Sequence, residues 1–160
     1  MLIIFAGLPG TGKTSIAREL ARQVHAVYVR IDSIEQAIRD SAAIARPMDD
    51  VGYRVGYAVA EDNLRLGRTV VADSVNPIAI TRDAWVEVAG RAKVRAVEVE
   101  VKCSDAEEHR RRVEGRTAPT WNEVVSREYH PWSRERVVIE TAGRNIEECV
   151  SDVRKVLAVS

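Results

Sequence analysis

The chain has few cysteines, few aromatic side chains and no excess of charge of either sign. Its 160 residues include two cysteines, Cys103 and Cys149, and aromatic residues make up 5% of the sequence. Two isolated cysteines form neither a disulfide framework nor a metal-ligand spacing, and as buried thiols they fit a reducing compartment. Lys plus Arg and Asp plus Glu number 24 each. Net charge therefore does not favour nucleic acid or a membrane surface as a partner.

Long apolar runs are absent as well. The first apolar run, residues 2–6, is too short for a secretory signal and lacks a basic leading segment. No run reaches the roughly 20 residues that span a bilayer. We therefore expect a cytoplasmic protein with no membrane segment. The length and the ordinary soluble composition predict one domain over residues 1–160, acting as a monomer or a homodimer.

The most informative feature that is present is a glycine-rich segment near the start. Residues 7–14 read G-L-P-G-T-G-K-T, a complete match to the phosphate-binding pattern G-x-x-x-x-G-K-[ST]. The glycines let backbone N–H groups close around an anion. In this pattern Lys13 reaches the β- and γ-phosphates, and the Thr14 hydroxyl binds Mg²⁺. The alternative is a glycine-rich turn with no ligand.

The context of this segment favours nucleotide binding over a plain turn. An apolar strand precedes the segment, and a helix follows it, so that the positive helix N-terminus faces the phosphates. We therefore predict binding of ATP with Mg²⁺. The residues predicted to bind ATP here are Gly7, Leu8, Pro9, Gly10, Thr11, Gly12, Lys13, Thr14 and Ser15.

Strand-like and helix-like segments alternate along the rest of the chain. The strands are expected over residues 2–6, 26–31, 69–73, 94–101 and 137–140. The helices are expected over residues 15–21, 33–40, 52–66, 81–91, 105–114, 120–130 and 146–157, with a loop over 41–50. This alternation predicts an α/β three-layer sandwich, in which helices cover both faces of a mostly parallel sheet of about five strands. With the phosphate-binding segment, that is the architecture of a P-loop NTPase.

Two acidic residues follow strands at what should be one edge of the sheet. Asp73 ends an apolar run, as a Walker B carboxylate does, and is predicted to hold Mg²⁺ together with Thr14. Asp32 follows the second strand, where a carboxylate can take the proton of an acceptor hydroxyl. The alternative for each is a helix cap, and Asp32 has Glu35 at capping-box spacing.

A basic stretch covers residues 109–116, near which we expect a short lid at about 110–120. Arg112 and Arg116 are four residues apart and share a helix face. Guanidinium groups in such a position stabilise the charge on a transferring γ-phosphate, and one can also stack on adenine. The alternative is a solvated face paired with neighbouring glutamates. Arg54 and Asn76 are candidates for contacts with the acceptor.

On these motifs the sequence resembles the small P-loop kinases of the AAA-type kinase family, with a nucleoside-monophosphate-kinase-like fold. Polynucleotide 5′-hydroxyl kinase, zeta toxin, gluconate kinase and chloramphenicol phosphotransferase belong to it. The matching pieces are residues 7–14, the R-I-D that ends at Asp32, and the V-V-A-D-S-V-N that ends at Asn76. H-R-R-R-V-E-G-R resembles the lid of that family, and V-I-E-T-A-G-R, which ends at Arg144, resembles its adenine-closing segment.

The resemblance implies ATP with Mg²⁺ as the donor and a hydroxyl as the acceptor. It implies catalytic roles for Lys13, Asp32, Arg112 and Arg116, and a place beside adenine for Arg144. Many relatives carry an arginine three residues after the aspartate that acts as base. Here that residue is Glu35 and the nearest arginine is Arg39, which we therefore assign to the acceptor site.

The predicted function is transfer of the γ-phosphoryl group of ATP to a hydroxyl of a small molecule. A nucleotide or polynucleotide 5′-hydroxyl kinase is an alternative, although the balanced charge and few aromatics make nucleic acid an unfavoured partner. A protein of another class, a regulatory NTPase that passes phosphate only to water, is the second alternative.

Overall fold

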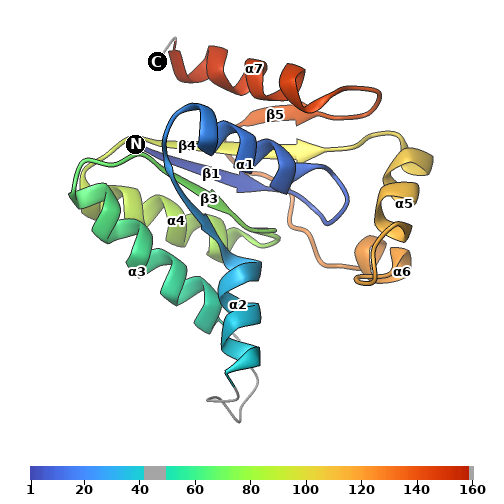
Figure 1. Ribbon diagram of the computed structural model, residues 1–160, viewed down its shortest axis with the longest axis horizontal. Helices are drawn as coiled ribbons and strands as arrows, with labels where there is room; N and C mark the ends of the chain where they lie inside the picture. The colour runs from blue at the N-terminus through green and yellow to red at the C-terminus, as the bar shows by residue number, and fades with distance from the viewer. Residues whose placement is uncertain (42–49, 159–160) are drawn as a thin grey trace.

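One parallel sheet forms the centre of the molecule. The computed structural model describes residues 1–41 and 50–158 (Figure 1). Its strands are β1 (Leu2–Ala6), β2 (Val27–Arg30), β3 (Val70–Asp73), β4 (Ala96–Lys102) and β5 (Val137–Glu140). They lie in the order β2-β3-β1-β4-β5, and each neighbouring pair is parallel. The predicted α/β architecture with about five strands is confirmed.

Helices cover both faces of this sheet (Figure 1). α1 (Lys13–Gln23) and α7 (Ile146–Ala158) lie on one face, and α3 (Val51–Arg65) and α4 (Ala79–Ala92) lie on the other. The remaining three helices lie at the carboxyl ends of the strands, and they are α2 (Ile31–Asp40), α5 (Ala106–Glu114) and α6 (Trp121–Val125). No helix in the described part of the chain is long and apolar enough to cross a membrane.

The central strand β1 is buried on both faces, as parallel strands between two helical layers are. Because side chains alternate along a strand, its residues divide between two cores. Ile3 and Phe5 belong to the cluster that α1 and α7 cover, and Leu2 and Ile4 to the cluster around Trp85 of α4. All five of these side chains have 0% relative exposure. This packing fixes the position of the glycine-rich loop that follows β1.

β4 has the polar face that strict alternation predicts, but that face is not solvated. Glu98 and Glu100 are 8% and 2% exposed, respectively. Arg134 forms an ion pair with Glu98, and Arg136 donates from Nη2 to Glu100 Oε2 at 2.7 Å. The chain segment that leads into β5 therefore covers this face with paired charges, which a buried carboxylate requires.

Several predicted segments differ from the structure at their ends. Six helices occur with ends shifted by one or two residues at most, and they are α1, α2, α3, α4, α5 and α7. The helix expected over 120–130 occurs but is shorter, because α6 ends at Val125 and residues 129–133 have no regular structure. The loop expected over 41–50 falls mainly on residues 42–49, which lie outside the described part. One of the two cysteines, Cys103, is only partly buried.

Two helix starts show which residues cap them. At α5 the Asp105 carboxylate is the cap, accepting from the backbone N–H of Glu108 at 2.9 Å. α2 already begins at Ile31, with Arg30 at the N-cap position and no side-chain cap. Asp32 therefore lies in the first turn of α2 rather than at its N-cap, and its carboxylate does not cap the helix.

The cap of α5 gives a first testable prediction. Asp105→Ala removes the one side-chain acceptor at this helix start and should lower the free energy of unfolding by about 1 kcal/mol. Asp105→Asn keeps an acceptor at the same position and should leave stability close to that of the parent. Urea denaturation of the three proteins measures both differences. Equal losses in the two variants would contradict the assignment of the cap.

Candidate functional site

The glycine-rich loop connects β1 to α1 in a conformation that side chains would obstruct. Gly7 and Gly10 have φ angles of +148° and +86°. A Cβ on Gly7 would lie 2.5 Å from the carbonyl oxygen of Val101, and a Cβ on Gly10 would lie 2.4 Å from Val113 Cγ2. These two positions therefore require glycine, and the loop can wrap closely around the N-terminus of α1.

One hydrogen bond within the loop and two contacts from other elements hold it in place. The Thr11 hydroxyl donates to the carbonyl of Leu8 at 2.8 Å within the loop itself. His109 of α5 contacts the carbonyl of Pro9 through Nε2 at 2.8 Å. The Thr141 hydroxyl, directly after β5, donates to the carbonyl of Thr11 at 2.8 Å. The loop is thus built before any ligand arrives.

Lys13 and Asp73 form a buried ion pair at the carboxyl ends of β1 and β3. Their side chains are 7% and 0% exposed, and Lys13 Nζ contacts Asp73 Oδ1. The Tyr28 hydroxyl donates to the other carboxylate oxygen at 2.6 Å. Burial works to raise the pKa of Asp73, but Lys13 and the hydrogen bonds outweigh it and hold the pKa below its usual value. Asp73 is therefore an ionised carboxylate inside the protein.

The surroundings of this pair suit a magnesium ion. The Thr14 hydroxyl lies 3.4 Å from Lys13 Nζ, so one hydroxyl and one carboxylate stand beside an anion-binding loop. Protein sites for Mg²⁺ use one or two carboxylates and take their remaining oxygens from substrate phosphates and water. Thr14 and Asp73 fit that pattern. In the described residues, no group of three or more His, Cys, Asp or Glu side chains offers a complete metal site.

A first cavity, of about 340 Å³, opens on the α1 and α7 side of the loop. Arg112 lines it with its guanidinium fixed, donating to the Thr141 hydroxyl at 2.9 Å and pairing with Glu108. Arg144 donates to Asp152 at 2.6 Å. The predicted residues brought together here are Gly10, Gly12, Ser15, Arg112, Arg116 and Arg144.

A second cavity, of about 460 Å³, lies on the other side of the same loop. The predicted residues that line it are Leu8, Pro9, Gly10, Gly12, Lys13, Thr14, Asp32, Arg39 and Arg116. Asp32 has a side chain that is 52% exposed and accepts from Arg30 Nη2 at 3.0 Å. Arg30 Nε lies 3.9 Å from Asp73, so this one guanidinium stands between the two acids. Gly10, Gly12 and Arg116 border both cavities.

Two predicted acceptor residues are not brought into this cavity. Arg54 is exposed on α3 and is not among the lining residues. Asn76 is 0% exposed, donates from Nδ2 to the carbonyl of Phe5 at 2.9 Å and has a φ of +47°. In this structure Asn76 ties the end of β3 to β1. Contact of either residue with an acceptor stays a prediction.

Several lining residues were missed at the level of sequence. Arg30, Gln36, Glu123 and Arg127 all line the second cavity. Arg30 had a usable signal, because it precedes Asp32 by two residues; in the structure its register partner in the sheet is Asp73. Arg127 had none, because a helix predicted through residue 130 gave no reason to place Arg127 at this cavity.

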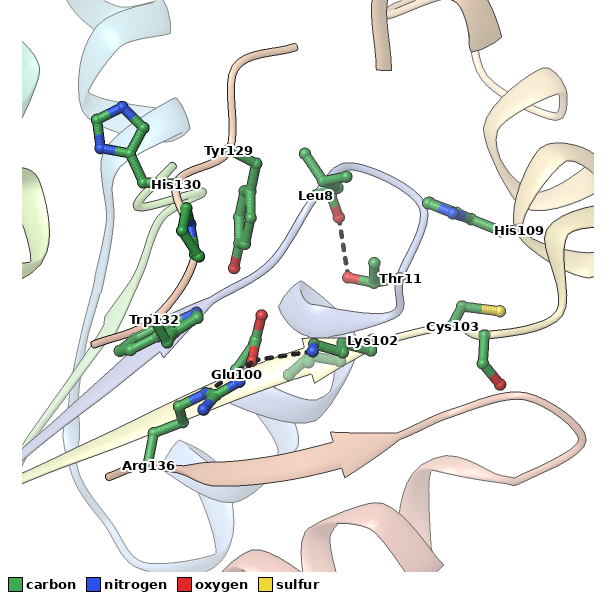
Figure 2. Close-up of a pocket in the computed structure, with 13 residues that line it drawn as sticks. Leu8, Thr11, Glu100, Lys102, Cys103, His109, Tyr129, His130, Trp132 and Arg136 are labelled. Atoms are coloured by element: carbon green, nitrogen blue, oxygen red, sulfur yellow. Dashed lines mark hydrogen bonds and ion pairs between the residues drawn. The ribbon is translucent and has the colours of Figure 1, made fainter. Parts of the chain in front are cut away.

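A third cavity, of about 520 Å³, lies behind the loop. Figure 2 shows Tyr129 and Trp132 on one side of it, His109 and Cys103 on the other, and the buried carboxylate of Glu100 at its floor. Of the predicted site residues, only Leu8 and Thr11 border it. Among the described residues, Leu8 is the only one that this lining shares with the second cavity, and it shares none with the first.

Residues 110–120, predicted as a short lid, comprise the end of α5 and the turn toward α6. They contribute Arg112 and Arg116 to the first cavity, and Arg116, Ala118 and Pro119 to the second. The segment therefore borders both spaces from one side. Its movement as a lid stays a prediction.

Comparison with known proteins agrees with this architecture. The model of the family described as AAA domain matches residues 2–136. No curated protein matches the chain. The structure of the Mycobacterium tuberculosis APS kinase CysC in complex with AMPPNP and APS has a TM-score of 0.75 and 22% identity, covering 98% of this chain and 96% of that chain.

Two further solved structures have the same fold. A gluconokinase from Sinorhizobium meliloti has a TM-score of 0.67 and 20% identity, covering 98% of this chain and 90% of that chain. Chaetomium thermophilum Kti12 in complex with ADP-AlF3 has a TM-score of 0.71 and 20% identity, covering 97% of this chain and 98% of that chain. At these identities the likeness is one of fold.

The buried ion pair gives a second prediction. Lys13→Met leaves the Asp73 carboxylate buried without its cation and should lower the free energy of unfolding by roughly 3–5 kcal/mol at pH 7. The low native pKa of Asp73 stabilises the parent above the unfolded pKa of about 3.9, and this contribution is lost as the pH falls through the native pKa. The difference between the two proteins should therefore shrink below about pH 4.

Urea denaturation between pH 3.5 and 8 measures this difference. The double variant Lys13→Met with Asp73→Asn carries no buried charge and should recover most of the loss. A cost that does not change with pH, or a double variant as unstable as the single one, would contradict the description of the pair.

Proposed function

This chain belongs to the AAA domain family, and we propose that within it the protein is an ATP-dependent kinase that phosphorylates a hydroxyl of a small molecule. One observation carries the proposal: the phosphate-binding loop separates two cavities, and Gly10, Gly12 and Arg116 border both. A protein that passes phosphate only to water needs no second cavity of about 460 Å³ with a carboxylate at its wall. A kinase needs one space for each substrate.

In this proposal the first cavity receives the donor. The loop and the N-terminus of α1 bind the phosphates of ATP through backbone N–H groups. Arg112 and Arg144 lie on the side where the adenine enters. Thr14 and Asp73 would hold Mg²⁺, which would offset phosphate charge when bound. Lys13 turns from Asp73 to the phosphates.

The second cavity receives the acceptor. Asp32 takes the proton of the acceptor hydroxyl, whose oxygen forms a bond to the γ-phosphorus while the bond between that phosphorus and the bridging oxygen of ADP breaks. Arg30 orients the Asp32 carboxylate. Lys13 and Arg116 stabilise the charge that spreads over the γ-phosphoryl oxygens. The products are ADP, the phosphate ester and one proton.

The lining of the second cavity also bears on nucleic acid as an acceptor. Proteins that bind single strands stack bases on aromatic side chains. Among the described residues that line this cavity there is no Phe, Tyr or Trp. A small aliphatic acceptor suits such a lining better than a polynucleotide end does.

The role of Asp32 gives a third prediction. Asp32→Asn should lower kcat for transfer from γ-labelled ATP by roughly 10²–10⁴-fold, because a general base contributes about that much. The KM for ATP should change less than about threefold, since Asp32 lines only the acceptor side. Asp62→Asn, an exposed aspartate on α3, serves as the matched control. Transfer by Asp32→Asn at the parental rate would contradict the proposal.

Arg116 gives a fourth prediction. Arginines that act at a transferring phosphoryl group contribute roughly 10³–10⁵ in rate, so Arg116→Ala should lower kcat within or near that range. Arg110→Ala tests an arginine of the same basic stretch whose side chain is 59% exposed and paired with Glu114. That control should keep parental kinetics. Single-turnover transfer with γ-labelled ATP measures both, and equal rates for the two variants would remove Arg116 from the mechanism.

A further inference from the structure

We infer that the acceptor carries an anionic group in addition to the hydroxyl that receives phosphate, and that Arg39 and Arg127 bind that group. The inference rests on the proposed function, because it concerns the acceptor side of the same site. The class of molecule is an aliphatic hydroxy acid or an aliphatic alcohol that carries a phosphate.

The charges that line the second cavity are unequal in number. Seven charged side chains border it, five of them positive and two negative. The positive ones are Lys13, Arg30, Arg39, Arg116 and Arg127, and the negative ones are Asp32 and Glu123. This excess stands out in a chain whose total charge is balanced, with 24 residues of each sign. The cavity as a whole therefore attracts anions.

Both acids of the cavity and two of its five cations already have partners inside the protein. Lys13 is paired with Asp73, and Arg30 with Asp32. Glu123 accepts from the backbone N–H and the hydroxyl of Thr120, both at 2.7 Å, and so closes the capping box of α6. Asp32 is thus neutralised by Arg30, whereas the hydrogen bonds to Glu123 come from neutral groups and leave its charge near Arg127. These hydrogen bonds lower the pKa of Glu123, and the charge of Arg127 helps to lower it.

Three arginines remain, and the γ-phosphoryl group accounts for one of them. Arg116 borders both cavities and faces the donor phosphates in the proposed function. Arg39 has a side chain 50% exposed, 3.8 Å from Glu35, and donates to Gln36 at 3.2 Å. Arg127 is exposed, and its guanidinium has no hydrogen bond or ion pair with the described residues. Arg39 forms only a long, exposed ion pair with Glu35, and Arg127 forms no direct one, so these two guanidiniums are held least firmly and can turn to an acceptor.

These two arginines come from separate elements and face the same space. Arg39 lies in the last turn of α2, and Arg127 follows α6. Burial raises the pKa of the Glu35 carboxyl, and the nearby charge of Asp32 raises it further. Arg39 and Arg127 both act to lower that same pKa. Both guanidiniums therefore lie within electrostatic reach of Glu35, and both line the second cavity.

Guanidinium groups in this arrangement suit one kind of ligand. They bind carboxylate and phosphate oxygens in a bidentate geometry, with bonds roughly twice as strong as neutral ones. A neutral polyol would use none of this excess charge. The cavity has no aromatic lining among its described residues, so a nucleobase has no surface to stack on. The anion is therefore carried by an aliphatic acceptor.

The test uses matched pairs of acceptors with γ-labelled ATP. The carboxylate pairs are gluconate with glucose and glycerate with glycerol, and the phosphate pair is glucose 6-phosphate with glucose. We expect phosphoryl transfer to at least one charged member, with kcat/KM at least 30-fold above that of its neutral partner. The two kinds of pair distinguish a carboxylate from a phosphate as the anion.

Variants of Arg39 and Arg127 test whether these residues cause the preference for a charged acceptor. Arg127→Gln and Arg39→Gln should each raise the KM of the charged acceptor at least 10-fold and leave kcat within threefold, because they remove binding and not chemistry. Arg127→Lys keeps the charge without the planar guanidinium, so its KM for the charged acceptor should lie between those of the parent and Arg127→Gln. Arg68→Gln, an exposed arginine at the opposite end of β3, should keep the parental KM. Circular dichroism checks that each variant is folded.

The outcomes separate the two claims. Equal use of charged and neutral partners, or an unchanged KM in both Gln variants, would overturn the inference while the kinase function stands. Release of phosphate to water with every acceptor, at the rate seen without one, would overturn the proposed function, and the inference would fail with it.

Discussion

The arrangement of the site depends on a buried ion pair at the carboxyl ends of two adjacent strands. β1 and β3 are parallel and in register from Leu2 with Val70 to Phe5 with Asp73. Lys13 follows β1 after the loop, and Asp73 ends β3, so the sheet itself brings the two side chains together. An isolated carboxylate at 0% exposure would be very costly, and Lys13 together with Tyr28 makes it tolerable. The pair keeps one cation and one anion ready where phosphate and metal are proposed to bind.

Most of the fold could be predicted because its signals are local and strong. Five apolar segments were short, rich in β-branched residues and separated by helical stretches, and all five became strands. The glycine-rich loop was recognisable because its glycine spacing predicts a particular backbone conformation. Gly7 and Gly10 have the positive φ angles that this conformation requires. The predictions failed at segment ends, where tertiary contacts decide. Arg82 of α4 donates to the carbonyl of His130 at 2.9 Å and holds the chain after α6 in an irregular path.

The site was predictable on the donor side and much less so on the acceptor side. Residues of the loop are consecutive, so one motif names them all. The lining of the second cavity comes from separate pieces: the loop, the end of β2, α2 and the segment around α6. No pattern in the sequence states that Arg39 and Arg127 face the same space. Asn76 shows the converse case, because its position after β3 suggested a ligand contact, whereas its amide supports β1.

The most direct test of the account is a crystal structure of the protein with Mg²⁺ and a non-hydrolysable ATP analogue. The account predicts that Lys13 leaves Asp73 for the β- and γ-phosphates, that Thr14 and Asp73 face the metal, and that the γ-phosphate lies between the two cavities beside Arg116. A complex in which Lys13 stays paired with Asp73, or in which the analogue occupies the cavity behind the loop, would contradict it.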